Sequence, residues 1–144
     1  MDVESLSPED ALVAVMIAVA AADERMTDSE LAWITATVAQ LPVFRAFDPE
    51  RIRPVSTQVA AFLGEEDGLD QLIDTVRVAL PAHLHETAYA LACDVAAADG
   101  RVSEIETRLL EMLRDDLGLE NLAAAGIERG ARARHQRLEP RTAN

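Results

Sequence analysis

Four carboxylates recur at matching places in the sequence and could together bind a metal ion. Asp23 and Glu30 lie in the segment VAAADERMTDSE, and Asp99 and Glu106 lie at the same places in VAAADGRVSEIE, 76 residues later. Seven of the twelve positions are identical. Carboxylate oxygens with no nearby Cys or His favour hard ions such as Ca²⁺, Mg²⁺ or Mn²⁺ over Zn²⁺. The candidate metal ligands are therefore Asp23, Glu30, Asp99 and Glu106.

Each copy has the pattern of a helical hairpin with an acidic loop. Thr27 with Glu30, and Ser103 with Glu106, are separated as in a capping box, which begins a helix. The two glutamates suit the partly positive first turn of that helix. Each loop aspartate instead follows the end of the preceding helix, where the negative end of the dipole costs about 0.3–1 kcal/mol.

Two explanations remain open for the unfavourable position that both loop aspartates share. Arg25 and Arg101 could form local ion pairs with the aspartates, or each aspartate could cap its own turn. Alternatively, the two hairpins pack as a pseudo-two-fold pair and their acidic loops meet. Two carboxylates about 6 Å apart repel by roughly 3 kcal/mol at an effective dielectric of 20. A bound cation would remove this repulsion.

The two loops differ from each other and from an EF-hand. The twelfth position counted from each aspartate is Ile34 or Leu110, where an EF-hand needs a bidentate Glu. Gly100 can adopt a left-handed conformation freely, whereas Glu24 at the matching place would lose roughly 1–2 kcal/mol. We therefore expect the second loop to be the better formed half of the site.

The rest of the chain predicts an all-α fold, a compact single-domain bundle of about six to seven helices. Apolar residues make up 49% of the chain and aromatic residues only 3%, which favours helices over a β-sandwich. Capping residues, prolines and glycines delimit the predicted helices, which lie near residues 8–22, 28–41, 69–80, 83–98, 104–117 and from 119 onward. Between the second and third of these we expect a short turn and then a further helix that ends near Gly64. The hairpin repeats fall near residues 12–41 and 88–117. We expect one domain over residues 1–127, followed by an Arg-rich helix end or tail over 128–144.

Charge and cysteine content exclude several classes of protein. The net charge of −13 disfavours a nucleic-acid partner or an anionic membrane surface. The longest apolar run, residues 11–22, is too short to span a bilayer. Cys93 has no partner for an internal disulfide, and the N-terminus is acidic where a signal peptide is basic. We therefore expect a cytoplasmic protein without a membrane span.

Other reactive residue types give weaker signals. His83 and His85 cannot share a helix face, so we expect a surface role. Cys93 lies in an apolar helix and is expected to be a small buried side chain, and Trp33 is expected to pack in the core. No nucleotide-binding loop or nucleophile motif is present in the sequence. The sequence therefore predicts no catalysis.

The C-terminal segment, residues 128–144, is locally basic. It contains five arginines and two glutamates. Arginines at a helix C-terminus interact favourably with the dipole. The segment could alternatively fold over the acidic body or meet an anionic partner.

The motifs AAADGRVSEIE, AAADERMTDSE and AAAGIERGARARHQRL resemble the tellurite-resistance protein TerB family, over about residues 8–137. The resemblance implies an all-helical fold with internal two-fold character and acidic residues that bind divalent cations. By resemblance, that role falls on the four candidate ligands, with Asp28, Asp94 and Glu104 as neighbours. Glu24 departs from the loop glycine of the family pattern.

We therefore expect a non-catalytic divalent-cation-binding module in a bacterial stress or tellurite-resistance system, with protein partners that the sequence does not identify. Tellurite is an anion, so the acidic cluster is not expected to bind it directly. The alternative is an acidic helical scaffold that binds a basic protein partner without metal.

Overall fold

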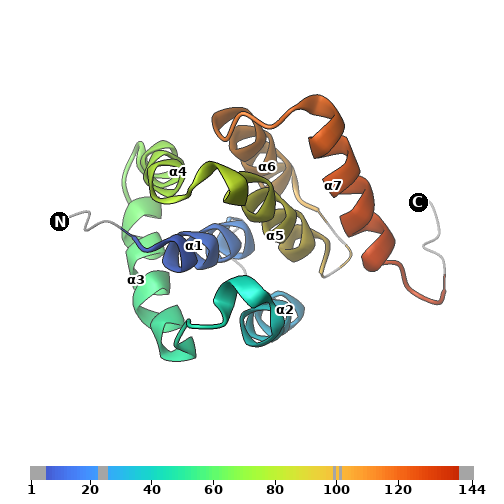
Figure 1. Cartoon of the computed structure of the whole chain (residues 1–144), viewed down its shortest axis with the longest axis horizontal. Helices are drawn as coiled ribbons and strands as arrows, with labels where there is room; N and C mark the ends of the chain where they lie inside the picture. Colours follow the sequence, from blue (N-terminus) through green and yellow to red (C-terminus); the bar gives the residue numbers. More distant parts are fainter. Residues whose placement is uncertain (1–5, 23–25, 99, 101, 140–144) are drawn as a thin grey trace.

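The computed structural model describes residues 6–22, 26–98, 100 and 102–139, and this part of the chain is all-helical. Figure 1 shows the α-helices wrapped around a central pair. The helices are α1 (Pro8–Ala21), α2 (Asp28–Gln40), α3 (Ile52–Leu63), α4 (Gly68–Ala79), α5 (His85–Ala97), α6 (Glu104–Asp116) and α7 (Asn121–Arg134). Three short 3-10 turns connect them, η1 (Pro42–Phe44), η2 (Pro49–Arg51) and η3 (Ala82–Leu84). The predicted all-α fold is confirmed.

Local sequence signals begin and end these helices. The Ser7 hydroxyl accepts a hydrogen bond from the Asp10 backbone N–H at 3.0 Å, and Pro8 occupies the first turn of α1. Proline follows soon after α2 and α4, where it stops the helix. Gly118 follows α6 with φ 69°, a left-handed conformation that suits a residue without a Cβ. These ends agree with the sequence prediction.

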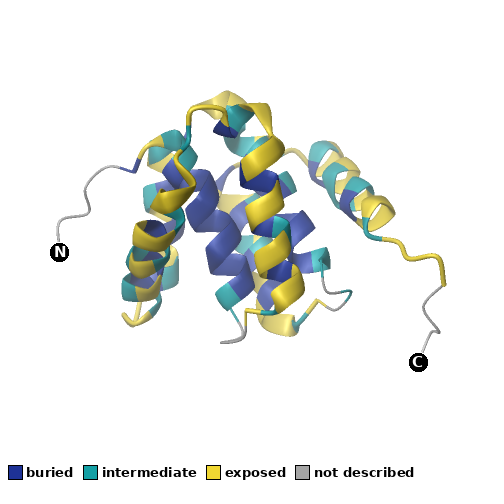
Figure 2. Cartoon of the chain, turned by 90° about the horizontal axis from the view of Figure 1, so that it is seen from below, coloured by how far each residue is buried: buried dark blue, intermediate teal, exposed yellow. Residues whose placement is uncertain are grey.

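Helices α1 and α5 form the centre of the molecule. Every residue of α1 from Asp10 to Ala20 is buried, so this helix is enclosed on all sides. Helix α5 packs directly against α1 and is buried from Leu91 to Ala96. Figure 2 shows these two helices as the dark blue core. The alanine-rich segments of the two predicted hairpins are therefore in contact, as the sequence indicates.

The outer helices divide between the two central ones. Helices α2, α3 and α4 pack on α1, whereas α6 and α7 pack on α5. Glycine permits the tight turn into α4, because a Cβ at Gly68 would lie 1.4 Å from the Phe62 carbonyl oxygen. The result is a bundle with one enclosed helix and a second helix that α7 covers along one side (Figure 1).

Two parts of the predicted organisation keep their status as predictions. The two-fold relation between the hairpins is not established by the packing of α1 on α5 alone. The boundary at residues 127 and 128 is also untested, and α7 runs through it without a break. Within the described residues, no helix is both long and apolar enough to cross a membrane.

Candidate cation site at the two hairpin corners

The first corner is the segment between α1 and α2, residues 22–27, and the second corner is the segment between α5 and α6, residues 98–103. Each corner ends in a complete capping box. The Thr27 N–H donates to Glu30 Oε1 at 2.8 Å, while Thr27 Oγ1 accepts from the Glu30 N–H at 3.1 Å. The matching distances between Ser103 and Glu106 are 3.0 and 3.1 Å. The capping boxes predicted from the sequence are confirmed at both places.

Both capping glutamates are buried, each with only 2% of its surface exposed. A buried carboxylate is costly unless hydrogen bonds compensate for lost hydration. Here the backbone N–H at the start of each box and the positive end of the following helix supply that compensation. Since Oε1 makes the capping bond, the second oxygen of each carboxylate takes no part in the box.

The other two predicted ligands, Asp23 and Asp99, lie outside the described residues, as do Arg25 and Arg101. Neither the local ion pairs nor a shared cation site is therefore tested by the geometry. Within the described part of the chain, no three His, Cys, Asp or Glu side chains form a group that could hold a metal ion. A site at the corners therefore requires the loop aspartates.

The described ends of the two hairpins lie on the same side of the molecule. The central helices α1 and α5 both run toward the lower edge of Figure 2, where the chain turns back into α2 and α6. Asp28 and Glu104 are exposed in the first turns of those two helices. The first turns of α2 and α6, which carry the capping glutamates, therefore follow helix ends that lie on one side of the bundle.

Gly100 has φ 80°, within the left-handed region that strains other residues. The predicted left-handed turn in the second corner is confirmed. The matching residue of the first corner, Glu24, lies outside the described residues.

Comparison with known proteins identifies a family. A family model described as "Tellurite resistance protein TerB" matches residues 9–129. The chain belongs to the TerB family. No curated protein and no solved structure matches it. The family match covers both corners and most of α7, so the shared features extend over almost all of the described bundle.

Asp94, a predicted neighbour of the TerB-type site, is engaged elsewhere. Its Oδ1 accepts from the Arg134 guanidinium at 2.8 and 3.1 Å and lies 3.2 Å from His135 Nε2. Only 7% of the Asp94 surface is exposed. This cluster holds the C-terminal end of α7 on α5, so one arginine of the basic C-terminal segment does fold onto the body.

A cavity of about 480 Å³ lies between α5, α6 and α7 and adjoins the second corner. Its walls include Cys93 from α5 and Glu128 from α7. The Tyr89 hydroxyl donates to Glu128 Oε2 at 2.6 Å. Burial raises the pKa of the Tyr89 hydroxyl above its ordinary value, and the bond to Glu128 raises it further. Burial also raises the pKa of the Cys93 thiol to about 12, which leaves it protonated at neutral pH.

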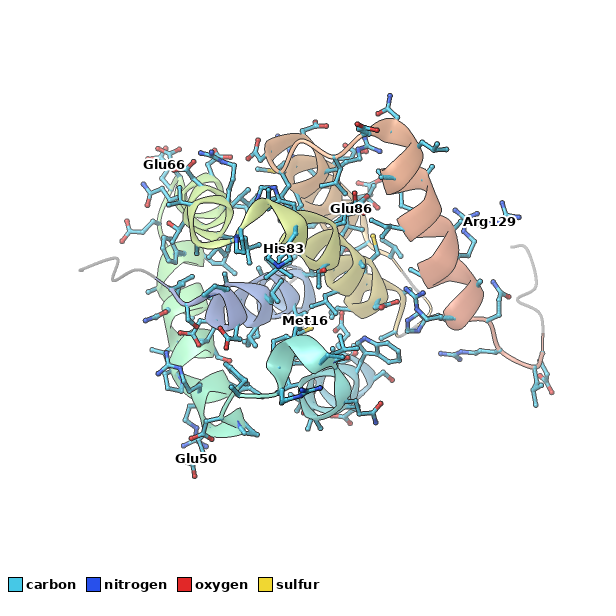
Figure 3. All side chains as sticks on the ribbon, in the orientation of Figure 1. Met16, Glu50, Glu66, His83, Glu86 and Arg129 are labelled. Atoms are coloured by element: carbon cyan, nitrogen blue, oxygen red, sulfur yellow. The ribbon has the colours of Figure 1, made fainter. Side chains whose placement is uncertain are left out.

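The structure also locates the other residues whose positions were predicted from the sequence. Cys93 is buried, as expected. His83 is exposed in η3 (Figure 3), and His85 begins α5 with its Nε2 3.3 Å from the Leu80 carbonyl oxygen. Trp33 is only partly buried, and its ring contacts the His135 ring at a tilt of 59°, with centroids 4.5 Å apart.

The sequence reasoning missed the polar partners of α7. Ala124, Glu128, Ala131 and His135 recur at helical spacing, and the two alanines are buried. A glutamate on such a stripe needs a buried donor, which Tyr89 supplies. The helical spacing of these α7 residues can be read from the sequence, but the contact with the Tyr89 hydroxyl of α5 cannot.

Proposed function

We propose that this TerB-family chain is a non-catalytic module that binds a hard divalent cation at the two hairpin corners. The proposed ligands are Asp23, Glu30, Asp99 and Glu106. The proposed setting is a bacterial stress or tellurite-resistance system in the cytoplasm. The observation that carries the proposal is the repeated construction of the corners, with a buried capping glutamate directly after an acidic loop in each.

The geometry of Glu30 and Glu106 supports a ligand role. Each carboxylate is fixed by its capping bonds, so its ordering is already achieved before a cation arrives. Carboxylate oxygens match the preference of Ca²⁺, Mg²⁺ and Mn²⁺.

The negative charge of the molecule favours a bound cation over four candidate carboxylates without one. The described ends of α1 and α5 lie on the same side of a chain whose net charge is −13. If the loop aspartates approach the two glutamates, their mutual repulsion destabilises the folded state. A divalent ion would offset that repulsion and stabilise both corners together.

Calorimetric titration with Ca²⁺, Mg²⁺ and Mn²⁺ separately tests the proposal. The variants Asp99→Asn and Glu106→Gln each remove one charge. Glutamine also serves at this position of a capping box, so Glu106→Gln should keep the helix start. Glu66→Gln is the matched control, because Glu66 is exposed at the α3–α4 turn (Figure 3).

We expect at least one of these cations to bind, and each corner variant to weaken its affinity about tenfold or more, as for loss of a charged ligand. The control should bind as the parent does. Absence of heat and of any thermal shift in the parent would refute cation binding. Cation affinity that is unchanged in both corner variants would show that the cation binds at another place in the molecule.

The alternative function, an acidic scaffold for a basic partner, is favoured by one separate observation. Apolar side chains are exposed at the corners, with Met26 at 40%, Val102 at 51% and Ile105 at 54%. They stand beside the exposed acids Asp28 and Glu104. Such a surface suits a basic amphipathic segment. Capture of such a peptide in chelator, lost on Ile105→Asp, would favour the scaffold.

A further inference from the structure

The cavity between α5, α6 and α7 is not lined by the proposed cation ligands Glu30 and Glu106, and it has the size of a small-molecule site. Its volume of about 480 Å³ lies within the roughly 300–1,000 Å³ of typical ligand pockets. Side chains from three helices and from the segment after α7 form its walls. Figure 1 shows α7 lying beside the α5–α6 hairpin, with the C-terminal segment continuing from its lower end.

The cavity walls combine an apolar part with a polar end. The apolar part comes from Cys93, Ala96 and Ala97 of α5, together with Leu110 of α6 and Ala131 of α7. Short side chains on facing helices leave room that larger ones would fill. This part of the cavity can accept a hydrocarbon chain or an aromatic ring.

The polar end is formed by residues that follow Ala131. Arg132, His135, Gln136, Arg137 and Glu139 all line the cavity. Within residues 128–139 there are four arginines and two glutamates, in a chain with a net charge of −13. The cavity therefore lies against the locally basic part of an acidic molecule.

Two acidic groups near the cavity, Glu128 and Asp94, are paired within the protein. Glu128 accepts from Tyr89 and lies 3.6 Å from the Arg114 guanidinium. Asp94 pairs with Arg134. Arg132 is exposed and forms no ion pair with any residue in the described ranges. Its guanidinium is therefore available to an anionic group at the mouth of the cavity.

We propose that this cavity binds a small amphipathic carboxylic acid, with its apolar body against Cys93, Ala96 and Ala131 and its carboxylate at Arg132. Gln136 and His135 lie at the same end and supply further polar contacts. The site does not use Glu30 or Glu106. Its failure would leave the proposed cation function untouched, and failure of cation binding would leave this site untouched.

Decanoate is the probe for this proposal, and decyltrimethylammonium is its control with the same chain and the opposite charge. Binding is followed by calorimetry and by amide shifts in two-dimensional NMR. Cys93 is the single cysteine and lies in the cavity wall. Because burial raises the pKa of this thiol, N-ethylmaleimide should modify it slowly at neutral pH, and occupancy of the cavity should slow the modification further.

Two variants test the two ends of the cavity. Arg132→Gln removes the proposed carboxylate partner, and Arg129→Gln is its matched control on the same helix. Arg129 points away from the bundle in Figure 3 and does not line the cavity. Ala97→Leu places a larger side chain in the apolar part, and circular dichroism confirms that this variant stays folded. If it does not, the arginine pair and the Cys93 rate still decide the question.

We expect decanoate to bind and to slow Cys93 modification several-fold. Arg132→Gln should weaken decanoate about tenfold, the usual effect of losing a charged hydrogen bond, while Arg129→Gln changes little. Ala97→Leu should also weaken it. No decanoate binding, or equal binding of the cationic control, would overturn the proposal. The proposal would also be overturned if bound decanoate left the rate of Cys93 modification unchanged. An equal loss of decanoate affinity in Arg132→Gln and Arg129→Gln would overturn it too.

Discussion

The two hairpins share their local construction but differ in what surrounds them. In each, a buried helix leads through an acidic corner into a capping box with a buried glutamate. Helix α1 is enclosed by neighbours on all sides, whereas α5 packs directly on α7 and has a cavity beside this contact. The same local sequence pattern therefore occurs beside a fully packed core in one half and beside a cavity in the other.

The buried aspartates show this difference most clearly. Asp10 lies in the first turn of α1 and accepts two hydrogen bonds from Arg51, at 2.7 and 3.0 Å. This bond to Asp10 raises the pKa of the Arg51 guanidinium. Asp94 lies in the last turn of α5 and is held by Arg134 and His135. The two hairpins thus connect to the rest of the fold through different ends of their central helices.

The largest expected effect tests whether the two central helices are equally packed. Val19 and Val95 occupy matching positions of the repeat, and both are 0% exposed. Changing either valine to alanine should lower the free energy of unfolding by about 2–3 kcal/mol, from lost burial and the cavity left behind. Urea unfolding measures this, with Val78→Ala, at an exposed position, as the control. A difference above about 1 kcal/mol between the two variants would show that the halves are not equivalent in packing.

The next largest loss of stability is expected from substitution of the two buried aspartates. Asp94→Asn should lower the free energy of unfolding by about 2 kcal/mol, because charge-assisted hydrogen bonds to Arg134 and His135 are lost. Asp10→Asn should lower the free energy of unfolding by more. The Asp10 carboxylate is also stabilised by the positive end of the α1 dipole, whereas Asp94 lies near the negative end of the α5 dipole. Thermal and urea unfolding would check the order. The reverse order would mean that His135 outweighs the helix dipoles.

Alkaline pH should destabilise the protein through the second hairpin. The pKa of Cys93 is about 12 in the folded state against 9.0 ordinarily, so between these values the folded state retains a proton that the unfolded state loses. The free energy of unfolding should then fall by about 1.4 kcal/mol per pH unit above pH 9. Above pH 10, the raised pKa of Tyr89 adds to the fall.

Urea unfolding between pH 8 and 10 isolates the cysteine. Cys93→Ala should flatten the profile in this range, because the position then carries no titratable group. The matching residue of the first hairpin, Ile17, has none either. A profile that is equally steep in the variant would assign the effect to other groups.

The smallest expected effect concerns the corner glycine. Gly100→Ala should lower the free energy of unfolding by about 1 kcal/mol, because alanine is strained at φ 80°. Gly118→Ala, at φ 69° with open space around its Cβ, is the control for backbone strain alone. The two variants should lose similar stability, while only Gly100→Ala should weaken cation binding. Equal cation affinity in both would separate the second corner from the metal site.

Much of the fold could be predicted because helix ends depend on nearby residues. Ser7, Thr27, Ser103 and Gly118 act within one turn of themselves, and the structure places them as expected. The partial exposure of Trp33 was not predictable, because its neighbour His135 lies about a hundred residues away in the chain. The candidate ligands were found from a repeat, and two of them, Glu30 and Glu106, are buried at the predicted helix starts.

The sequence by itself determined the helices, their caps and the two hairpin patterns, because these depend on hydrogen bonds and dipoles that span only a few residues. Only the tertiary structure decided which central helix is enclosed, which arginine reaches Asp94, and that a cavity forms beside the second corner. Those features depend on side-chain volumes and charges from helices distant in sequence, whose meeting is fixed by packing of the whole core.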